Sequence, residues 1–302
     1  MTHAHPFVSQ EALSVAGQKE PAACGAAVRP SAVGQAATTR QLRLLTYNIQ
    51  AGIATRGFQD YLTHGWKHVL PYPARLENLA RVGSFLRGYD IVGLQEADSG
   101  SLRSGFVNLT EYLAEHGGFP YWYDQTNRDL GHFAQHSIGL VSRLVPYAVE
   151  EHRLPGRIKG RGALCSFFGD ARDPIVLVIV HLALSRAARM RQLAFIAERL
   201  VAYRHVVLMG DLNCEANSAE ISWLTTRLGL REPQFEHRTF PSWRPARNID
   251  HILVSPSLQV RSAEVLRHTF SDHLPVAMEV GLPYPVAVSG DLAATPVLRA
   301  AV

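Results

Sequence analysis

The sequence is poor in the features that mark several large classes of protein. Its 302 residues include only three cysteines, Cys24, Cys165 and Cys214, which lie far apart and in no CxxC arrangement. We therefore expect neither a disulfide framework nor a zinc cluster, and reduced thiols in a reducing compartment explain this usage better. No apolar run approaches the roughly eighteen residues that mark a membrane-spanning helix, so we expect no transmembrane segment.

Charge of one sign is also scarce. The formal net charge is +4 and the sequence pI is about 9.1, a mild basic bias that is compatible with a phosphate-bearing substrate but does not demonstrate one. The opening residues, MTHAHPFVSQEALSVAG, lack the basic stretch and the apolar run of a secretory signal. The sequence thus predicts a cytoplasmic protein, and it predicts no protein partner.

Composition divides the chain into three parts. Residues 1–40 are rich in Ala, Gly, Ser, Thr and Pro without a sustained period, and residues 283–302 are similar. Such segments are typical of flexible leaders and tails. No internal repeat and no long Pro/Gly/Ser linker interrupts the residues between them, so we predict that 41–282 is a single domain.

Short apolar runs recur through this central part. They are rich in Ile, Val and Leu, and turn or charged residues bound them, which favours buried strands. The runs are LRLLTY (42–47), DIVGLQ (90–95), SIGLVS (137–142), IVLVIVHL (175–182), HVVLMG (205–210) and IDHILVS (249–255). Helical periodicity follows Pro73 as far as Gly88 and follows a candidate N-cap at Ser185, and shorter helices are expected at 105–116 and 218–228. Strands that alternate with helices give an α/β class, but the pattern does not decide between one sheet and two.

Most of the apolar runs end in a polar residue that can bind a metal or move a proton. These residues are Asn48, Glu96, His181, Asp211, Asn213, Asp250, Asp272 and His273. Strand ends gather at one rim in α/β folds, so residues distant in sequence can form one cluster there. Taken alone, an aspartate after a strand is more often a helix N-cap, and a lone histidine is more often a hydrogen-bonded, half-buried residue. The hypothesis of a site therefore rests on the whole set.

Six segments that carry these residues follow one another along the chain. They are TYNIQ (46–50), GLQEAD (93–98), VHLALS (180–185), MGDLN (209–213), NIDHILVS (248–255) and SDHLPV (271–276). Together, and in this order, they resemble the endonuclease/exonuclease/phosphatase superfamily, whereas a string such as GDLN alone would arise by chance. The resemblance implies an α/β, four-layer sandwich of two packed β-sheets flanked by helices, with the site at one edge.

The resemblance also implies a metal site. Glu96 matches the family's principal metal carboxylate, Asn48 matches an amide that helps to hold the metal, and Asp272 matches a carboxylate on the metal side. Oxygen donors suit Mg²⁺, with Mn²⁺ as a substitute, and no thiolate or histidine-rich set invites zinc. A hard cation neutralises the charge that builds up on phosphate oxygens. We therefore expect Mg²⁺ as the cofactor.

The remaining five residues match catalytic positions of the family. Asp211 and Asn213 match the pair placed over the scissile phosphate, the first activating water and the second donating to a phosphate oxygen. His273 matches the catalytic histidine, and Asp250 matches the carboxylate that orients it. His181 matches a second histidine of pancreatic-type deoxyribonucleases and neutral sphingomyelinases, where it could protonate the leaving oxygen.

The activity implied is hydrolysis of a phosphate ester by direct attack of water on phosphorus. Because His181 resembles the deoxyribonuclease and sphingomyelinase branches, a phosphodiester of nucleic acid or of a phospholipid head group is the preferred substrate. The alternatives are a phosphomonoesterase of the same fold, resembling inositol phosphatases, and a non-catalytic phosphate-binding module. Replacement of Glu96, Asp211 or His273 would mark the binding module, and all three are present.

Three weaker features leave alternatives open. Many relatives have an Asn where this chain has Ile138, and Gln135 or His136 are candidates to compensate for it. The loop at 150–162 carries several basic residues, which solvation explains as well as contact with phosphate. The aromatic stretch around Trp122 fits strand packing better than base stacking or lipid contact.

Overall fold

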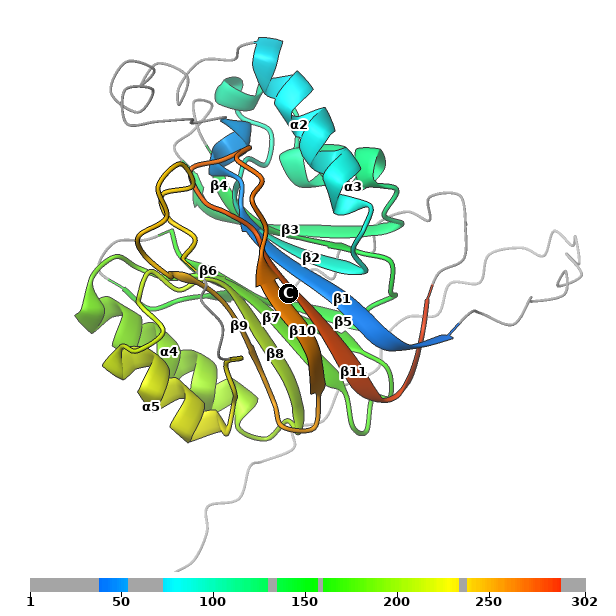
Figure 1. Ribbon diagram of the computed structural model, residues 1–302, viewed down its shortest axis with the longest axis vertical. Coiled ribbons are helices and arrows are strands. Elements are labelled where there is room, and N and C mark those ends of the chain that lie inside the picture. The colour runs from blue at the N-terminus through cyan, green and yellow to red at the C-terminus, as the bar shows by residue number, and fades with distance from the viewer. Residues whose placement is uncertain (1–37, 54–72, 130–134, 157–159, 234–237, 289–302) are drawn as a thin grey trace, which may run out of the picture. The chain divides into compact units, whose positions relative to one another are not determined.

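The computed structural model describes residues 38–53, 73–129, 135–156, 160–233 and 238–288, which form two β-sheets (Figure 1). In spatial order the first sheet contains β10 (Gln259–Val265), β11 (Val276–Ala287), β1 (Thr38–Asn48), β2 (Ile91–Ala97), β4 (Gln135–Ser142) and β3 (Tyr121–Asp129). The second sheet contains β5 (Ala148–Arg153), β6 (Gly162–Phe168), β7 (Ile175–His181), β8 (His205–Asp211) and β9 (Asp250–Val254). Two packed sheets with helices outside them are the fold that the sequence motifs predict.

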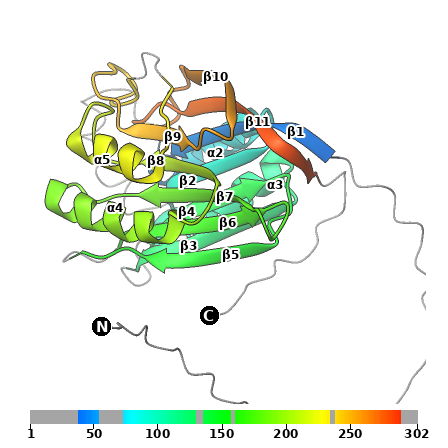
Figure 2. The same ribbon diagram turned by 90° about the horizontal axis from the view of Figure 1, so that it is seen from below.

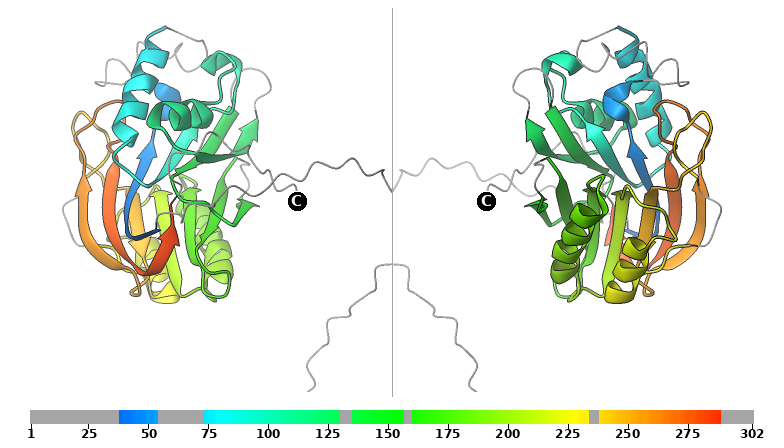
Figure 3. Two further views of the ribbon diagram at one scale, coloured as in Figure 1. Left: turned by 90° about the vertical axis from the view of Figure 1, so that its right-hand side faces the viewer. Right: turned by 90° about the vertical axis from the view of Figure 1, so that its left-hand side faces the viewer.

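A pair of helices covers the outer face of each sheet. The first sheet carries α2 (Pro73–Leu86) and α3 (Leu109–Gly117), and the second carries α4 (Arg186–Leu200) and α5 (Ala219–Leu228). Figures 2 and 3 show strands between the two helix pairs. Short 3-10 turns, η1 (Gln50–Gly52) and η3 (Leu102–Ser104), follow β1 and β2. None of the helices in the described part of the chain combines the length and apolar character needed to cross a membrane.

Helix ends agree with their capping residues. Asn108 caps α3 by accepting hydrogen bonds from the N–H groups of Thr110 and Glu111, which is why this helix begins later than the predicted residue 105. Ser218 caps α5 in the same way through the N–H of Ile221. Ser185 occupies the predicted N-cap position of α4, although its hydroxyl makes no capping bond.

Three apolar clusters hold the four layers together. One lies between the sheets and includes Leu44, Ile179, Met209 and Ile252. A second joins the second sheet to α4 and α5, and a third joins the first sheet to α2 and α3. Because both faces of β7 and β8 are covered in this way, all their residues are buried, and both strands appear in the sequence as continuous apolar runs.

The layer between the two sheets changes from apolar to polar at one end. Side chains alternate between the faces of a strand, so residues that point toward the other sheet lie two positions apart. On this face a polar residue follows the last apolar one in β1 (Leu44, then Thr46 and Asn48), in β7 (Ile179, then His181) and in β8 (Met209, then Asp211). The predicted site residues thus occupy the polar end of the inner layer.

Some strands lack the apolar runs from which strands are predicted. β5 and β10 lie at sheet edges, and their exposed and half-exposed side chains leave no apolar run in the sequence. β6 is fully buried, but Gly162, Cys165 and Ser166 dilute its apolar character. Pairing with neighbouring strands, rather than composition, determines these elements.

The first sheet extends past both predicted limits of the domain, residues 41 and 282. β1 begins at Thr38, β11 runs to Ala287, and these two residues pair with each other. Val286 is buried beside them. The composition of these terminal residues resembles that of the flanking segments, but pairing and burial keep them in the sheet. Residues 1–37 of the predicted leader and 289–302 of the predicted tail lie outside the described residues, as do Arg157 and Lys159 of the basic loop.

Candidate active site

Three neighbouring strands of the second sheet place His181, Asp211 and Asp250 in one row. β7 and β8 run parallel, and their register pairs His181 with Asp211. β8 and β9 run antiparallel, and their register pairs Asp211 with Asp250. All three residues are buried, and His181 Nε2 lies 3.4 Å from Asp211 Oδ2. Strand pairing therefore brings together side chains that are far apart in the chain.

The first sheet contributes Asn48 and Glu96 from the opposite side. Asn48 Nδ2 donates a hydrogen bond to Asp211 Oδ2 over 3.2 Å, which links the two sheets. Glu96 lies where the β2–β4 register shifts, and its φ of 54° is in the left-handed region. The irregularity presents its carboxylate to the second sheet, with Oε1 3.8 Å from His181 Nε2. Non-glycine residues held in this conformation are strained, and such strain is concentrated at functional sites.

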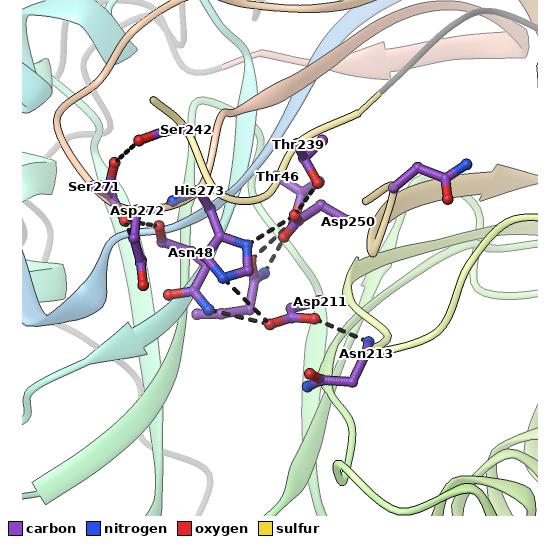
Figure 4. Close-up of polar contacts among 12 residues, drawn as sticks. Thr46, Asn48, Asp211, Asn213, Thr239, Ser242, Asp250, Ser271, Asp272 and His273 are labelled. Atoms are coloured by element: carbon purple, nitrogen blue, oxygen red, sulfur yellow. Dashed lines mark hydrogen bonds and ion pairs between the residues drawn. The ribbon is translucent and has the colours of Figure 1, made fainter. Parts of the chain in front are cut away.

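Residues 271–273, which precede β11, complete the cluster. His273 Nδ1 lies 2.8 Å from Asp250 Oδ2, and His273 Nε2 lies 3.9 Å from Asp211 Oδ2 (Figure 4). The Ser271 hydroxyl donates to the carbonyl oxygen of Asn48 over 2.7 Å, so this loop is fixed to the end of β1. The structure thus brings the predicted residues to one end of the sandwich, and their chemical roles remain predictions.

The GDLN segment has a backbone shape that few residues accept. Gly210 has a φ of 144°, and a Cβ at this position would overlap the carbonyl oxygen of Val180. Asn213 has a φ of 53°, which asparagine tolerates better than most residues. Its backbone N–H donates to Asp211 Oδ1 and its side-chain amide donates to the carbonyl oxygen of Leu182, both over 2.9 Å. An amide nitrogen has two hydrogens, so one is not used in these bonds.

Burial and like charge raise the pKa values of two carboxyl groups in the site. Burial and the carboxylates of Asp250 and Glu96 raise the pKa of Asp211 to about 7, although His273 and the N–H of Asn213 act in the opposite direction. Burial is also the main cause that raises the pKa of Asp272 to about 6. A carboxyl group with a pKa near neutrality is suited to accept and release protons at physiological pH.

His273 is protonated over a wide pH range. Burial tends to lower its pKa, but the charge of Asp250, the hydrogen bond from His273 to that carboxylate and the charges of Asp211 and Asp272 together raise it to about 10. The imidazolium therefore persists at neutral pH.

His181 has the opposite protonation state. Burial lowers its pKa well below the ordinary value, and the positive charges of Arg161, His273 and His136 act in the same direction. The imidazole is therefore neutral at physiological pH. A neutral ring at this position is poorly suited to the proton donation that the sequence motifs imply for His181.

The donor set fits a hard divalent cation. Glu96 and Asp272 supply carboxylate oxygens, and the negative charge of Glu96 contributes to the raised pKa of Asp272, so a cation near both groups would relieve their repulsion. Ligand atoms of Asp211, Asp250 and His273 also lie within 4.8 Å of one another. His273 Nδ1 and Asp250 Oδ2 are already engaged with each other in a hydrogen bond. The oxygen donors of Glu96, Asp272 and Asn48 therefore suit Mg²⁺ better.

Two positioning groups are not among the site residues predicted from the sequence. Thr239 Oγ1 donates to Asp250 Oδ2, the same oxygen that His273 contacts, and no local pattern around Thr239 signals this partner. Asp98 accepts hydrogen bonds from the N–H groups of Gly100 and Ser101 and so fixes the turn that follows Glu96. Its place before a Ser-Gly pair is typical of an aspartate turn and is a usable signal.

The weaker sequence features have structural explanations. Ile138, where many relatives have an Asn, is buried in the apolar cluster between the sheets. Tyr123 packs against the same cluster, and Trp122 packs against the cluster beneath α2 and α3. These contacts support the interpretation that the aromatic stretch serves strand packing.

Comparisons with known proteins agree with this architecture. The model of the Endonuclease/Exonuclease/phosphatase family matches residues 45–273. No curated protein matches the sequence. An endonuclease/exonuclease/phosphatase structure from Beutenbergia cavernae DSM 12333 is 21% identical with a TM-score of 0.62, over 81% of this chain and 72% of that chain.

Two further solved structures carry more specific names. The mannosyl-6-phosphatase of Bacteroides thetaiotaomicron VPI-5482 is 18% identical with a TM-score of 0.59, over 79% of this chain and 99% of that chain. The catalytic domain of human Nocturnin, with bound sulfate, is 17% identical with a TM-score of 0.59, over 82% of this chain and 97% of that chain. At these identities the likeness establishes a shared fold.

Proposed function

The chain belongs to the endonuclease/exonuclease/phosphatase family, and we propose that it is a Mg²⁺-dependent hydrolase of phosphate esters, with phosphodiesters as its preferred substrates. The observation that carries the proposal is the position of Asp211. Its carboxylate lies 3.2 Å from Asn48 Nδ2, 3.4 Å from His181 Nε2 and 3.9 Å from His273 Nε2. A proton acceptor is thus surrounded by groups that can bind an anion.

Glu96, Asn48 and Asp272 would hold the cation, Mg²⁺ or Mn²⁺ in its place, which supplies positive charge beside the phosphate. Asp211 then accepts a proton from the attacking water, a role that its raised pKa supports. Asn213 donates the remaining hydrogen of its amide to a phosphate oxygen. These groups act on the phosphate rather than on the alcohol that it carries.

His273 is the proton donor in this proposal. Its imidazolium, held by the hydrogen bond to Asp250, donates its proton to the leaving ester oxygen as the bond from that oxygen to phosphorus breaks. His181 is neutral, so we assign it hydrogen bonding within the site and revise its implied role as a general acid. The physical reason for the revision is the burial of His181, which lowers its pKa, and the charges of Arg161, His273 and His136 add to this effect.

Two observations bear on the class of ester. The presence of His181 supports a phosphodiester, either of nucleic acid or of a phospholipid head group. The similarity to a mannosyl-6-phosphatase supports the alternative, a phosphomonoesterase. We also propose a cytoplasmic location, which the free, buried thiols of Cys165 and Cys214 support.

The proposal is tested by incubating the purified protein and Mg²⁺ with bis(p-nitrophenyl) phosphate, p-nitrophenyl phosphate, plasmid DNA and phospholipid vesicles. We expect Mg²⁺-dependent hydrolysis, faster for the diester than for the monoester. Activity on plasmid that falls steeply with salt indicates a nuclease, because binding of the nucleic-acid backbone releases counterions. Absence of hydrolysis of every ester contradicts the proposal and favours the non-catalytic binding module.

A further inference from the structure

Two amide side chains of β3 have buried oxygen atoms without a hydrogen-bond partner among the described residues. Gln125 follows Tyr123 on the face of β3 that points toward the second sheet. Asn127 lies where the β3–β4 register shifts, and its amide oxygen reaches Gly162 of the second sheet as well. Gln125 Oε1 and Asn127 Oδ1 are buried, and neither has a hydrogen-bond partner in the part of the chain that the structure describes. Gln125 is only 3% exposed. Leaving a buried acceptor unpaired is costly, so such a group calls for a ligand or another specific explanation.

Both amide oxygens point to the same place, which is the start of β6. A Cβ on Gly162 would overlap Asn127 Oδ1 and would lie 2.7 Å from Gln125 Oε1. A side chain at this position would displace the two amides, and glycine avoids this. At this end of the sandwich, β3 therefore presents amide oxygens rather than apolar atoms to the start of β6.

This place adjoins the candidate active site. The β6–β7 register pairs Ala163 with Val180, so Gly162 and His181, the next residue of each strand, end the two strands side by side. Arg161 directly precedes Gly162 and adds a positive charge at the same strand end. The polar end of the inner layer thus continues from Asp211 through His181 to the amides of β3.

The two unpaired amide oxygens indicate which chemical groups a ligand at this place would carry. An unpaired carbonyl oxygen needs a donor, and two neighbouring oxygens suit two neighbouring donors, as in the vicinal hydroxyls of a sugar or a polyol. Rotation about the terminal torsion of an amide is soft, so these oxygens can turn toward a ligand that enters beside His181.

We propose that Gln125 and Asn127 form a hydroxyl-binding subsite for the alcohol portion of the substrate, a sugar or polyol attached to the phosphate on the side of His181. The inference rests on the proposed function and narrows its substrate class. It adds the hydroxyls beside the phosphate as a second point of recognition, separate from the groups that hold the phosphate itself.

The test compares two diesters that differ only in their hydroxyls, glyceryl methyl phosphate and propyl methyl phosphate. We expect the wild-type protein to prefer the glyceryl ester. Gln125→Leu should lower kcat/KM for the glyceryl ester by about tenfold or more, the scale of one lost hydrogen bond to a substrate hydroxyl, and should leave the propyl ester within about twofold. Equal losses for both esters, or no loss for either, overturn the inference.

Ser166→Ala is the matched control. Ser166 lies on β6, and its Oγ is also buried and without a hydrogen-bond partner among the described residues, but it is further from the strand end. This variant should keep the wild-type preference between the two esters. If Ser166→Ala and Gln125→Leu lose the preference for the glyceryl ester to the same extent, the effect comes from general packing. This result overturns the subsite.

Binding without catalysis separates this inference from the proposed function. Calorimetric titration should give tighter binding of glycerol 1-phosphate than of propyl phosphate to the wild-type protein, and Gln125→Leu should remove the difference. If the protein hydrolyses neither diester but shows this pattern, the hydroxyl subsite stands and the proposed function fails. Equal binding of the two monoesters to the wild-type protein overturns the subsite.

Discussion

His181 and Asp211 end two neighbouring parallel strands side by side, with the histidine Nε2 3.4 Å from the carboxylate Oδ2. The same oxygen accepts a hydrogen bond from Asn48 of the other sheet over 3.2 Å. Asp211 is therefore a point at which the two sheets of the sandwich meet through polar contacts. Any change in its charge acts on residues of both sheets.

Replacement of Asp211 by Asn should remove the proton acceptor. The variant keeps the size and part of the hydrogen bonding of the side chain, so we expect a folded protein whose hydrolysis of bis(p-nitrophenyl) phosphate is slower by roughly 10²- to 10⁴-fold. Asp173→Asn is the matched control, because Asp173 contacts a different buried histidine, His205, at the other end of β8. Full activity of Asp211→Asn would mean that another group accepts the proton.

Replacement of Asp250 by Asn should change the pH dependence of hydrolysis. The pKa of His273 is raised to about 10, chiefly because Asp250 outweighs the effect of burial, so the charged form is present below that pH and is lost as the pH rises through it. Without the negative charge the pKa falls, and the basic limb of the kcat profile should move to lower pH. A basic limb at the same pH in both proteins would show that the protonation of His273 does not control kcat.

Strand and site predictions succeed where local sequence carries the signal. β7 and β8 are covered on both faces, so their apolar runs and the polar residues that end them, His181 and Asp211, are visible in the sequence. Edge strands such as β10 have exposed and half-exposed side chains along their whole length, so they leave no such apolar run in the sequence. Burial on both faces is what made the site-bearing strands predictable.

Partners that come from distant segments of the chain could not be predicted in this way. Thr239 contacts Asp250, and Gln125 lies beside Gly162, but neither pair is related by strand or helix periodicity. The protonation state of His181 likewise depends on burial and on Arg161, which only the folded chain brings near. Contacts of this kind follow from the packing of two sheets rather than from any one segment.

Replacement of Thr239 by Val should weaken the support of Asp250. Asp250 Oδ1 has no hydrogen-bond partner among the described residues, so loss of the Thr239 hydroxyl leaves the carboxylate with the contact to His273. We expect the free energy of unfolding to fall by about 1–3 kcal/mol, measured by urea denaturation.

The control for this change is Thr225→Val. Thr225 is a half-buried threonine of α5 whose hydroxyl, among the described residues, bonds only to the backbone of its own helix. A change within about 0.5 kcal/mol is expected for this variant. Similar losses of unfolding free energy in both variants would show that the hydrogen bond from Thr239 to Asp250 stabilises the fold no more than an ordinary threonine hydrogen bond does.

Replacement of Glu220 by Gln should destabilise the loop that follows His181. Arg189 donates to the carbonyl oxygen of Leu184 in this loop and pairs with Glu220 at 2.7 Å, and both charged side chains are largely buried. Breaking a buried pair costs roughly 3–5 kcal/mol, so urea denaturation at pH 7 should show a large loss. Glu198→Gln, an exposed change on α4, should show almost none.

The same variant has a defined pH dependence. Burial opposes ionisation of Glu220, but the hydrogen bond and charge of Arg189 prevail and lower its pKa. A lowered carboxyl pKa stabilises the fold above the ordinary value of 4.5, and this contribution is lost as the pH falls through the lowered value. The stability difference between wild type and Glu220→Gln should therefore shrink in acid, and a constant difference from pH 7 to pH 3 would disprove the coupling.

The most direct measurement is the affinity for the cation in the absence of substrate. Calorimetric titration of the wild-type protein with Mg²⁺, and with Mn²⁺ as a second probe, should detect binding that Glu96→Gln weakens by about tenfold or more. Glu264→Gln, an exposed change on β10, should bind as the wild type does. Equal affinity in all three proteins would contradict the claim that Glu96 and the residues around it form one divalent-cation site.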